Sequence, residues 1–316
     1  MREPPDGRGW SERLRWLGWV LAAACLLFLA QRLTRMDWSR LADLSWPALL
    51  AGLTGLTLVR LAVIALLCRC WGWVLAGVVG SGSGDWSLGT LFAVYARGAV
   101  AKYLPGNVME FIARNLLGRR LGVDQATLAL ASLLEVALTF GTAVSLSLPF
   151  AAGILGPFLG GWAAPAWMNN GIPLLALPLV VLAGVMLVAR RGGGGGVGLL
   201  AAAARAVTGH VLVFAVTGTM LAMALALVGA AVTPAALPLL ISAHALAWWA
   251  GLITPGAPGG LGVLEAVLLM ILGERFGPEV TLAAALLLRL AAIGGDWLAF
   301  ALTGRLKALA ACWRWP

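Results

Sequence analysis

The sequence predicts an all-α polytopic membrane protein: an inverted 3+3 repeat with six full transmembrane helices and two re-entrant helical hairpins. Three observations predict this fold. The chain of 316 residues is 61% hydrophobic and only 11% charged, which is far from the composition of a soluble domain. Several apolar stretches reach the ~20 residues needed to cross a bilayer. A segment that carries charges also occurs twice, once in each half of the chain.

The duplicated segment reads EFIARNLLGRRLG at Glu110–Gly122 and EAVLLMILGERFG at Glu265–Gly277. Glu, Leu, Gly, Arg and Gly recur in register. In so apolar a chain a matched Leu is expected by chance, whereas matched Glu, Gly and Arg are not. Each copy follows Pro-Gly breaks, at 105–106 in the first half and at 255–256 and 258–259 in the second. Duplicated membrane segments with breaks at corresponding places are typical of transporters.

Six apolar stretches are predicted to cross the membrane fully, at 14–31, 47–67, 124–149, 172–189, 206–230 and 279–304. Two further apolar segments, 87–120 and 236–276, are split by Pro-Gly motifs and carry charges. We expect each to form a hairpin of two short helices that enters and leaves on one side. The alternative is two ordinary kinked spans per segment. Irregular backbone cannot face lipid, so such breaks must be buried in protein or line a watery cavity.

These elements predict a single membrane domain over residues 1–316. The first repeat is expected at 10–155 and the second at 165–310, with a Gly-rich cytoplasmic linker at 192–205. Each repeat holds three full spans, which is an odd number, so the second repeat enters the membrane inverted relative to the first. Hairpin 87–120 then opens from the cytoplasm and hairpin 236–276 from outside. Inverted repeats of this kind place a substrate site near the bilayer midplane.

The distribution of Lys and Arg predicts that both termini are cytoplasmic. Only Arg32, Arg35, Arg40 and Arg275 fall in segments on the opposite side, and the loop 150–171 has no Lys or Arg. Basic residues are scattered between apolar spans and form no stripe, so the net charge of +9 does not indicate nucleic-acid binding.

Ionisable residues inside a membrane are costly and are functional candidates by default. At the first tip, cations and an amide donor surround a broken backbone, and helix N-terminal N–H groups add partial positive charge. We expect this tip to attract an anion such as a phosphate. The second tip exposes backbone at several glycines, although a tight turn without a binding role is the alternative. The predicted substrate-binding residues are Arg97, Lys102, Pro105, Gly106, Asn107, Arg114, Pro258, Gly259, Gly260 and Gly262.

The intramembrane acids are candidates for coupling or for counter-ions. This group consists of Glu110, Glu265 and Asp296. For Glu110 the alternative is a self-neutralising pair with Arg114, because residues at i,i+4 lie on the same face of a helix. Asp296 either couples transport or pairs with Arg289. Glu135 and Arg289 are repeat equivalents of opposite charge, and we expect them to form a structural ion pair.

No residue pattern indicates an enzyme. The four cysteines and two histidines lack metal-ligand or disulfide spacing, and there is no nucleotide-binding loop and no catalytic His/Asp/Ser cluster. We therefore expect no cofactor and no metal.

Two motifs resemble those of a known group. Tyr103-Leu104-Pro105-Gly106 followed by Glu110 and Arg114 is the first, and Pro258-Gly259-Gly260-Leu261-Gly262-Val263-Leu264-Glu265 with Arg289 is the second. Together they resemble the flippase-like transmembrane family, which comprises the membrane domain of lysylphosphatidylglycerol synthase and its stand-alone relatives, including hopanoid-associated members. Where that family often has a basic residue after the first Pro-Gly, this chain has Asn107, and Lys102 can supply the charge instead.

The resemblance implies a protein of the bacterial cytoplasmic (inner) membrane that moves lipids. We expect a lipid translocase that moves an anionic or isoprenoid-linked lipid between leaflets by alternating access at two opposed hairpins. The alternatives are a small-solute or ion secondary transporter on the same scaffold, and a non-transporting membrane partner of a lipid-synthesis enzyme.

Overall fold

The computed structural model describes residues 45–80, 86–104, 108–155, 196–254 and 257–312, with isolated positions between residues 20 and 34. Within these ranges every regular element is a helix. Five helical segments are long and apolar enough to cross a membrane, and the chain is therefore a multi-pass membrane protein. Most of the predicted span 14–31 and all of the predicted span 172–189 lie outside the described residues.

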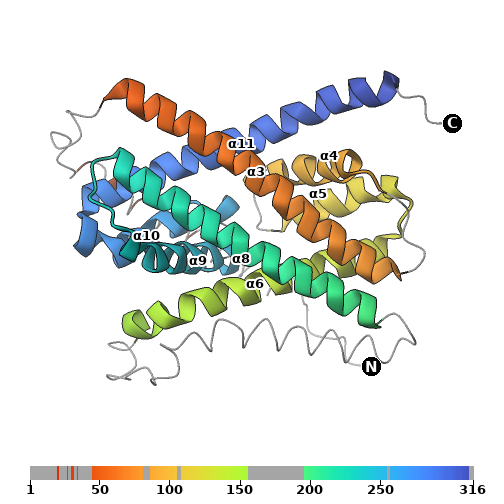
Figure 1. The fold of residues 1–316 in the computed structure, drawn as a ribbon, viewed down its shortest axis with the longest axis horizontal. Helices are drawn as coiled ribbons and strands as arrows, with labels where there is room; N and C mark the ends of the chain where they lie inside the picture. Colours follow the sequence, from red (N-terminus) through yellow and green to blue (C-terminus); the bar gives the residue numbers. More distant parts are fainter. Residues whose placement is uncertain are drawn as a thin grey trace, which may run out of the picture.

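Four long helices coincide with predicted spans and are confirmed as membrane-length apolar segments. They run lengthwise through the molecule in Figure 1. Continuous apolar sequence keeps them helical, because every backbone hydrogen bond in lipid must be satisfied within the segment. The four are α3 (Trp46–Val79), α6 (Gln125–Leu155), α8 (Gly196–Leu227) and α11 (Pro278–Cys312).

Helix α8 begins earlier than its hydropathy predicted. It starts at Gly196, so most of the linker expected at 192–205 is helical rather than irregular. The reason is local: Leu199–Ala206 reads LLAAAARA, and Ala, Leu and Arg have the strongest intrinsic preference for helix.

Three short elements lie in the segment 87–120, where the first hairpin is expected: α4 (Leu88–Ala99), the 3₁₀ turn η2 (Val100–Tyr103) and α5 (Met109–Gly118). α4 begins where the Ser87 hydroxyl accepts a hydrogen bond of 3.2 Å from the Thr90 N–H, a standard N-cap. Helices α4 and α5 pack against each other and lie together at one end of the molecule (Figure 1).

The corresponding elements of the second half are α9 (Leu237–Ile253), the turn η6 (Pro258–Gly260) and α10 (Val263–Phe276). α9 and α10 also pack against each other, at the opposite end of the molecule (Figure 1). The incoming leg differs from the expected short helix. Together with the preceding turn η5 (Pro234–Ala236), α9 makes a segment of 20 residues that is long and apolar enough to cross a membrane.

The internal repeat of the sequence has a counterpart in local structure. A long helix, two shorter helices and a second long helix follow one another twice along the described chain. The repeat-equivalent glycines Gly122 and Gly277 both adopt positive φ, of 74° and 86°, where other residues are strained. Gly122 closes the turn η3 (Arg119–Leu121) before α6, and Gly277 closes α10 before α11.

Helices α3 and α8, the first long helices of the two halves, pack against each other in antiparallel directions. The evidence is a series of small residues along the contact: a Cβ on Gly77 would lie 2.7 Å from the Cβ of Ala202, and one on Gly209 would overlap the Sγ of Cys70. At the other end, a Cβ on Gly52 would overlap Leu227. Small residues let membrane helices approach closely and gain packing energy.

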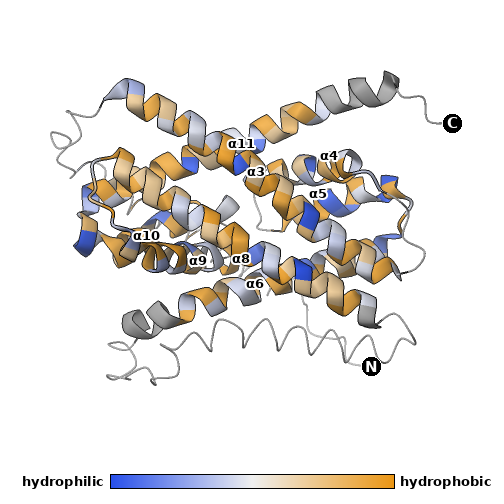
Figure 2. Ribbon diagram, in the orientation of Figure 1, coloured by the Kyte–Doolittle hydropathy of each residue, from blue (hydrophilic) through white to orange (hydrophobic). Residues whose placement is uncertain are grey.

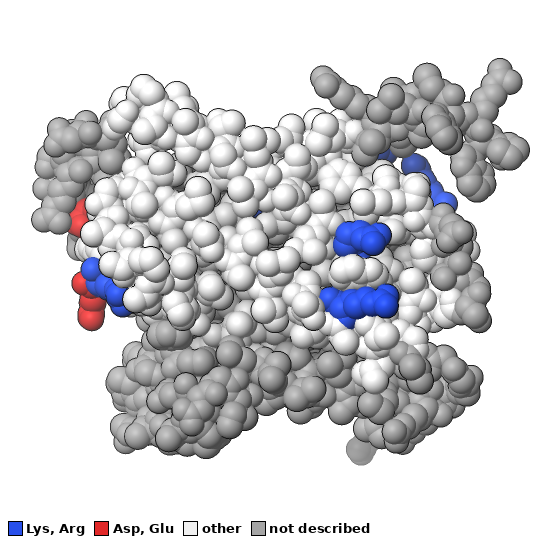
Figure 3. All heavy atoms as spheres, in the orientation of Figure 1, with Lys and Arg blue, Asp and Glu red and all other residues white. Residues whose placement is uncertain are grey.

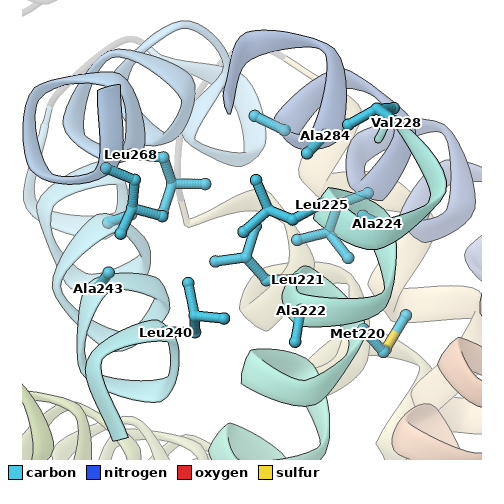
Figure 4. Close-up of a cluster of buried hydrophobic side chains, with 14 of the residues drawn as sticks. Met220, Leu221, Ala222, Ala224, Leu225, Val228, Leu240, Ala243, Leu268 and Ala284 are labelled. Atoms are coloured by element: carbon cyan, nitrogen blue, oxygen red, sulfur yellow. The ribbon is translucent and has the colours of Figure 1, made fainter. Parts of the chain in front are cut away.

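The larger of the two main apolar clusters joins α8 to α9, α10 and α11. Its centre is formed by Leu221 and Leu225 of α8 with Leu240 of α9 and Leu268 of α10, all fully buried (Figure 4). Ala243 and Ala284 fill the gaps between the larger side chains. This cluster packs α9 and α10 against the long helices α8 and α11.

The outer surface of the described chain is apolar. Leu133 is 69% exposed and Met270 is 66% exposed, and hydrophobic residues occur along the length of the described helices in Figure 2. The face in Figure 3 carries few charged side chains among the described residues. Exposed apolar area of this extent is rare on soluble proteins, and here it is the lipid-facing surface.

Candidate substrate cavity

A cavity of about 210 Å³ lies inside the helical body, and residues from α3, α6, α8 and α11 and from the pairs α4–α5 and α9–α10 line it. Its volume is small compared with the ~300–1,000 Å³ of pockets that take drug-sized ligands. Six charged residues contribute to the lining: Arg60, Lys102, Glu110, Glu135, Arg289 and Asp296. The cavity therefore suits a compact polar group rather than acyl chains.

Asp296 of α11 is the anchor of a cluster of two cations and a phenol. Its side chain has no exposed surface, and its Oδ1 accepts hydrogen bonds from Nε and Nη2 of Arg60 at 3.3 and 3.2 Å. Oδ2 forms an ion pair with Lys102 and accepts a 2.6 Å hydrogen bond from the Tyr103 hydroxyl. Two cations on one carboxylate leave this cluster with one positive charge in excess.

The second hairpin tip is held by an ion pair between α10 and α11. Arg289 donates from Nε to Glu265 at 2.7 Å, and from Nη1 and Nη2 to the carbonyls of Gly259 and Gly260 at 2.8 and 3.3 Å. The second oxygen of Glu265 accepts from the Gly262 N–H at 2.8 Å. These glycines have φ of 57°, 69° and 84°, a conformation in which side chains are disfavoured. The arrangement satisfies polar backbone groups exposed by the break.

The first half has its own ion pair, between α5 and α6. Nη2 of Arg114 donates to Glu135 at 2.6 Å, and both side chains are buried. The guanidinium also lies over the Tyr95 ring, 4.8 Å from its centroid, a favourable cation–π contact. Arg114 is thus held by Glu135 and by the aromatic ring, although its buried Nε has no hydrogen-bond partner among the described residues, and it does not line the cavity.

These pairings correct one expectation and bear on two alternatives that the sequence left open. Glu135 and Arg289 are both in ion pairs, but with Arg114 and Glu265 rather than with each other. Each partner comes from the neighbouring helix of the same half, which a repeat alignment does not reveal. Arg114 likewise pairs across to α6, and its alternative i,i+4 pair with Glu110 is not among the ion pairs of the described residues. Asp296 takes Arg60 and Lys102 as partners instead of Arg289.

Two polar side chains in the cavity lining have no partner among the described residues. Glu110 of α5 is half-buried, and no hydrogen bond or ion pair joins it to another residue that the structure describes, although the charges of Lys102 and Arg114 act on it from farther away. His244 of α9 is 8% exposed, and its buried Nδ1 has no hydrogen-bond partner. Buried polar groups are normally satisfied, so Nδ1 of His244 is an atom that a bound ligand could engage. Glu110 is available for a different reason, because it is half-buried and lines the cavity without a direct contact to another described side chain.

The predicted site residues fall into three groups. Lys102, Gly259 and Gly260 line the cavity, as do Glu110, Glu135, Arg289 and Asp296. Several others stand apart from the lining: Arg97 donates to the Thr303 hydroxyl at 2.9 Å, Pro258 begins η6, and Gly262 and Glu265 support the second tip. Pro105, Gly106 and Asn107 lie outside the described residues.

Arg60, Tyr95, Tyr103 and His244 line the cavity but were not predicted as site residues. For Arg60 a signal existed, because an arginine within an apolar stretch rarely lacks a function. Tyr103 directly follows Lys102 at the first break. His244 and Tyr95 gave no signal above that of ordinary buried residues.

No family model and no curated protein matches the chain.

Proposed function

We propose that the protein is a lipid translocase that moves an anionic or isoprenoid-linked lipid between leaflets. The observation that carries the proposal is the small cavity with six charged residues, enclosed by helices whose outer surface is apolar. Charges inside a membrane protein mark substrate or ion pathways. The cavity takes the headgroup, and the acyl or isoprenoid chains remain in the bilayer.

An inverted repeat with two opposed hairpins supports alternating access in this proposal. Three observations favour it: α3 and α8 run antiparallel, the pairs α4–α5 and α9–α10 lie at opposite ends of the molecule, and the two tips meet at η2 and η6. A Cβ on Gly259 would lie 3.9 Å from the carbonyl oxygen of Lys102. In inverted-repeat transporters the site lies where the broken segments of the repeats meet.

The headgroup charge is inferred from the cluster at Asp296. Arg60 and Lys102 share this one carboxylate, and each is still 18% exposed at its side chain. A phosphate oxygen would gain charge-assisted hydrogen bonds from both cations.

The resemblance to the flippase-like transmembrane family remains part of the proposal. The second motif behaves as one unit, since Arg289 joins Glu265 to the carbonyls of Gly259 and Gly260. Membership would place the protein in a bacterial cytoplasmic membrane with both termini inside.

A small-solute or ion transporter is the second candidate, favoured by the cavity volume of about 210 Å³. Such a protein needs a closed pathway, whereas lipid passage requires an opening between helices toward the bilayer.

The experiment is a headgroup-accessibility assay in proteoliposomes that contain the full chain. Fluorescent phosphatidylglycerol, phosphatidylcholine and an isoprenoid phosphate are compared for the wild type, Lys102→Ala and Arg60→Gln. Arg205→Gln is the control, because Arg205 is exposed on α8 and does not line the cavity. We expect movement of the anionic lipids alone, lost in both cavity variants and kept in the control.

Absence of lipid movement by a folded protein would refute the translocase. Uptake of phosphate or another small anion would then support the second candidate. Absence of any movement would support a non-transporting partner of a lipid-synthesis enzyme.

A further inference from the structure

The cavity lining is electrically neutral before a ligand binds. Among the described lining residues, positive and negative charges are equal in number: three cations (Arg60, Lys102 and Arg289) and three carboxylates (Glu110, Glu135 and Asp296). The two buried partners behind the lining, Arg114 and Glu265, cancel each other. A bound anion therefore leaves one negative charge uncompensated in an apolar interior, and such a charge is strongly unfavourable unless it is paired.

An acid in or behind the lining could compensate the extra negative charge by taking up a proton, but three of the four acids (Asp296, Glu135 and Glu265) are unsuited to this. Asp296 holds Arg60, Lys102 and the Tyr103 hydroxyl. Glu135 and Glu265 each hold an arginine. Protonation of any of these would leave a buried cation without its counter-charge. Glu110 makes no hydrogen bond or ion pair with another described residue, so it can gain a proton and break neither. The charges that act on it from farther away are those of Lys102 on η2, Arg114 on α5, Glu135 on α6 and Asp296 on α11.

Glu110 is also placed to respond to the anion. It lies on α5, which contacts η2, the turn that carries Lys102. Lys102 is one of the two cations at the proposed phosphate position. A change in the charge of Glu110 therefore alters the electrostatic potential at the position where the anion binds.

We propose that the cavity takes up one proton on Glu110 for each anionic phosphate group that binds at Arg60 and Lys102. This inference rests on the proposed transport of an anionic substrate. A proton from solution adds to a carboxylate oxygen of Glu110, and the phosphate and proton cross together with no net charge. Transport of the anion is then coupled to a proton gradient, and Glu265 has no part in that coupling.

Three other titratable groups face the cavity. Tyr95 and Tyr103 donate their hydroxyl protons to Glu135 and Asp296, so both are already in use. His244 lines the cavity without a partner, and a proton on its imidazole would balance the charge equally well. It lies on α9 rather than beside Lys102, and it serves as the competing site in the test.

The test measures proton uptake by titration calorimetry of the detergent-solubilised full chain in buffers of different ionisation enthalpy. The probes are dihexanoylphosphatidylglycerol, dihexanoylphosphatidylethanolamine and inorganic phosphate. We expect uptake of about one proton per bound phosphatidylglycerol in the wild type, a linkage between ligand and proton binding. Glu110→Gln should bind the lipid without uptake and with an affinity that no longer depends on pH.

Three variants complete the design. Glu110→Asp keeps a carboxyl group and should retain uptake. His244→Gln should retain it as well. Glu274→Gln is the matched control, since Glu274 is exposed at the end of α10 and does not line the cavity. Because the wild-type value alone decides whether a proton is bound, the test does not depend on the folding of Glu110→Gln.

The outcomes separate this inference from the proposed function. Phosphatidylglycerol bound without proton uptake overturns the inference and leaves the translocase standing. Uptake lost in His244→Gln but kept in Glu110→Gln also overturns it, and so does a preference for phosphatidylethanolamine, which carries its own ammonium group. Uptake with inorganic phosphate but no lipid binding supports the proton site and refutes the lipid substrate. Absence of binding by every probe refutes both.

Discussion

Replacement of Arg289 by Gln should destabilise the protein more than any other single change at the second hairpin tip. Arg289 donates hydrogen bonds to Glu265 at 2.7 Å and to the carbonyls of Gly259 and Gly260 at 2.8 and 3.3 Å. The Glu265 side chain is 1% exposed. Glutamine carries no charge and is too short to reach all three acceptors, so it leaves a buried carboxylate without its cation.

The magnitude follows from the cost of breaking a buried ion pair on one side, about 3–5 kcal/mol. Glu265→Gln should cost less, about 1.5–3 kcal/mol, because Arg289 keeps both carbonyls and the amide oxygen still accepts from Gly262. The double variant should cost little more than Arg289→Gln alone. The coupling energy between the two sites should therefore reach at least about 1.5 kcal/mol.

The assay is equilibrium unfolding in mixed detergent micelles, followed by far-UV circular dichroism, for both single variants and the double variant. Arg205→Gln, on the exposed face of α8, is the control and should stay within about 0.5 kcal/mol of the wild type. Losses below about 1 kcal/mol in both single variants would mean a solvated pair, and strictly additive losses would mean no pair at all. Either result would refute the reasoning.

Three further predictions follow from helix packing, from the cation cluster and from a helix cap. Gly218→Ala should lower the free energy of unfolding by about 1–3 kcal/mol through overpacking, since its Cβ would lie 2.6 Å from the Cα of Ile241. Gly198→Ala is the control on the same helix: the added Cβ enters open space, so this variant should be neutral or stabilising in the same unfolding assay. Gly295→Ala places a Cβ 2.5 Å from the Cγ of Arg60, so it should displace Arg60 from Asp296 and weaken phosphatidylglycerol binding in calorimetry; unchanged affinity would remove Arg60 from the site. Asp124 lies in the loop before α6, and hydrogen bonds from the Thr127 hydroxyl and N–H hold its pKa below the usual value. The ionised Asp124 cap stabilises the fold above the unfolded-state pKa, and this stabilisation is lost as pH falls through the folded-state pKa. The difference in melting temperature between wild type and Asp124→Ala should therefore shrink between about pH 6 and about pH 3. A difference that grows on acidification would contradict this.

The helical architecture was largely predictable from the sequence. The spans 47–67, 124–149, 206–230 and 279–304 are confirmed as parts of α3, α6, α8 and α11. Hydropathy located them because the cost of placing a segment in lipid is a sum over its own residues. Helix ends were less certain, as the early start of α8 shows. An apolar Ala-rich run continues a helix past the point where the membrane requires it.

The membership of the cavity was only partly predictable. Lys102, Glu110 and Asp296 were identified because intramembrane charges are rare, and all three line the cavity. Arg97 met the same criterion but bonds to Thr303 away from it. The sequence alone predicts roughly how deep in the membrane a charged residue lies. It does not say toward which neighbour the side chain points.

The sequence by itself determined that this chain is an apolar, helical membrane protein, and which of its residues bring charge into that interior. Only the tertiary structure decided how those charges are paired: Arg114 with Glu135, Arg289 with Glu265, and Asp296 with Arg60 and Lys102. The physical reason is that insertion cost is a local, additive property of the chain, whereas an ion pair depends on distances of a few ångströms between helices far apart in sequence. Among the described residues, tertiary packing therefore left Glu110 without an ion pair and Nδ1 of His244 without a hydrogen-bond partner in the cavity lining, and no pattern in the sequence marks that difference.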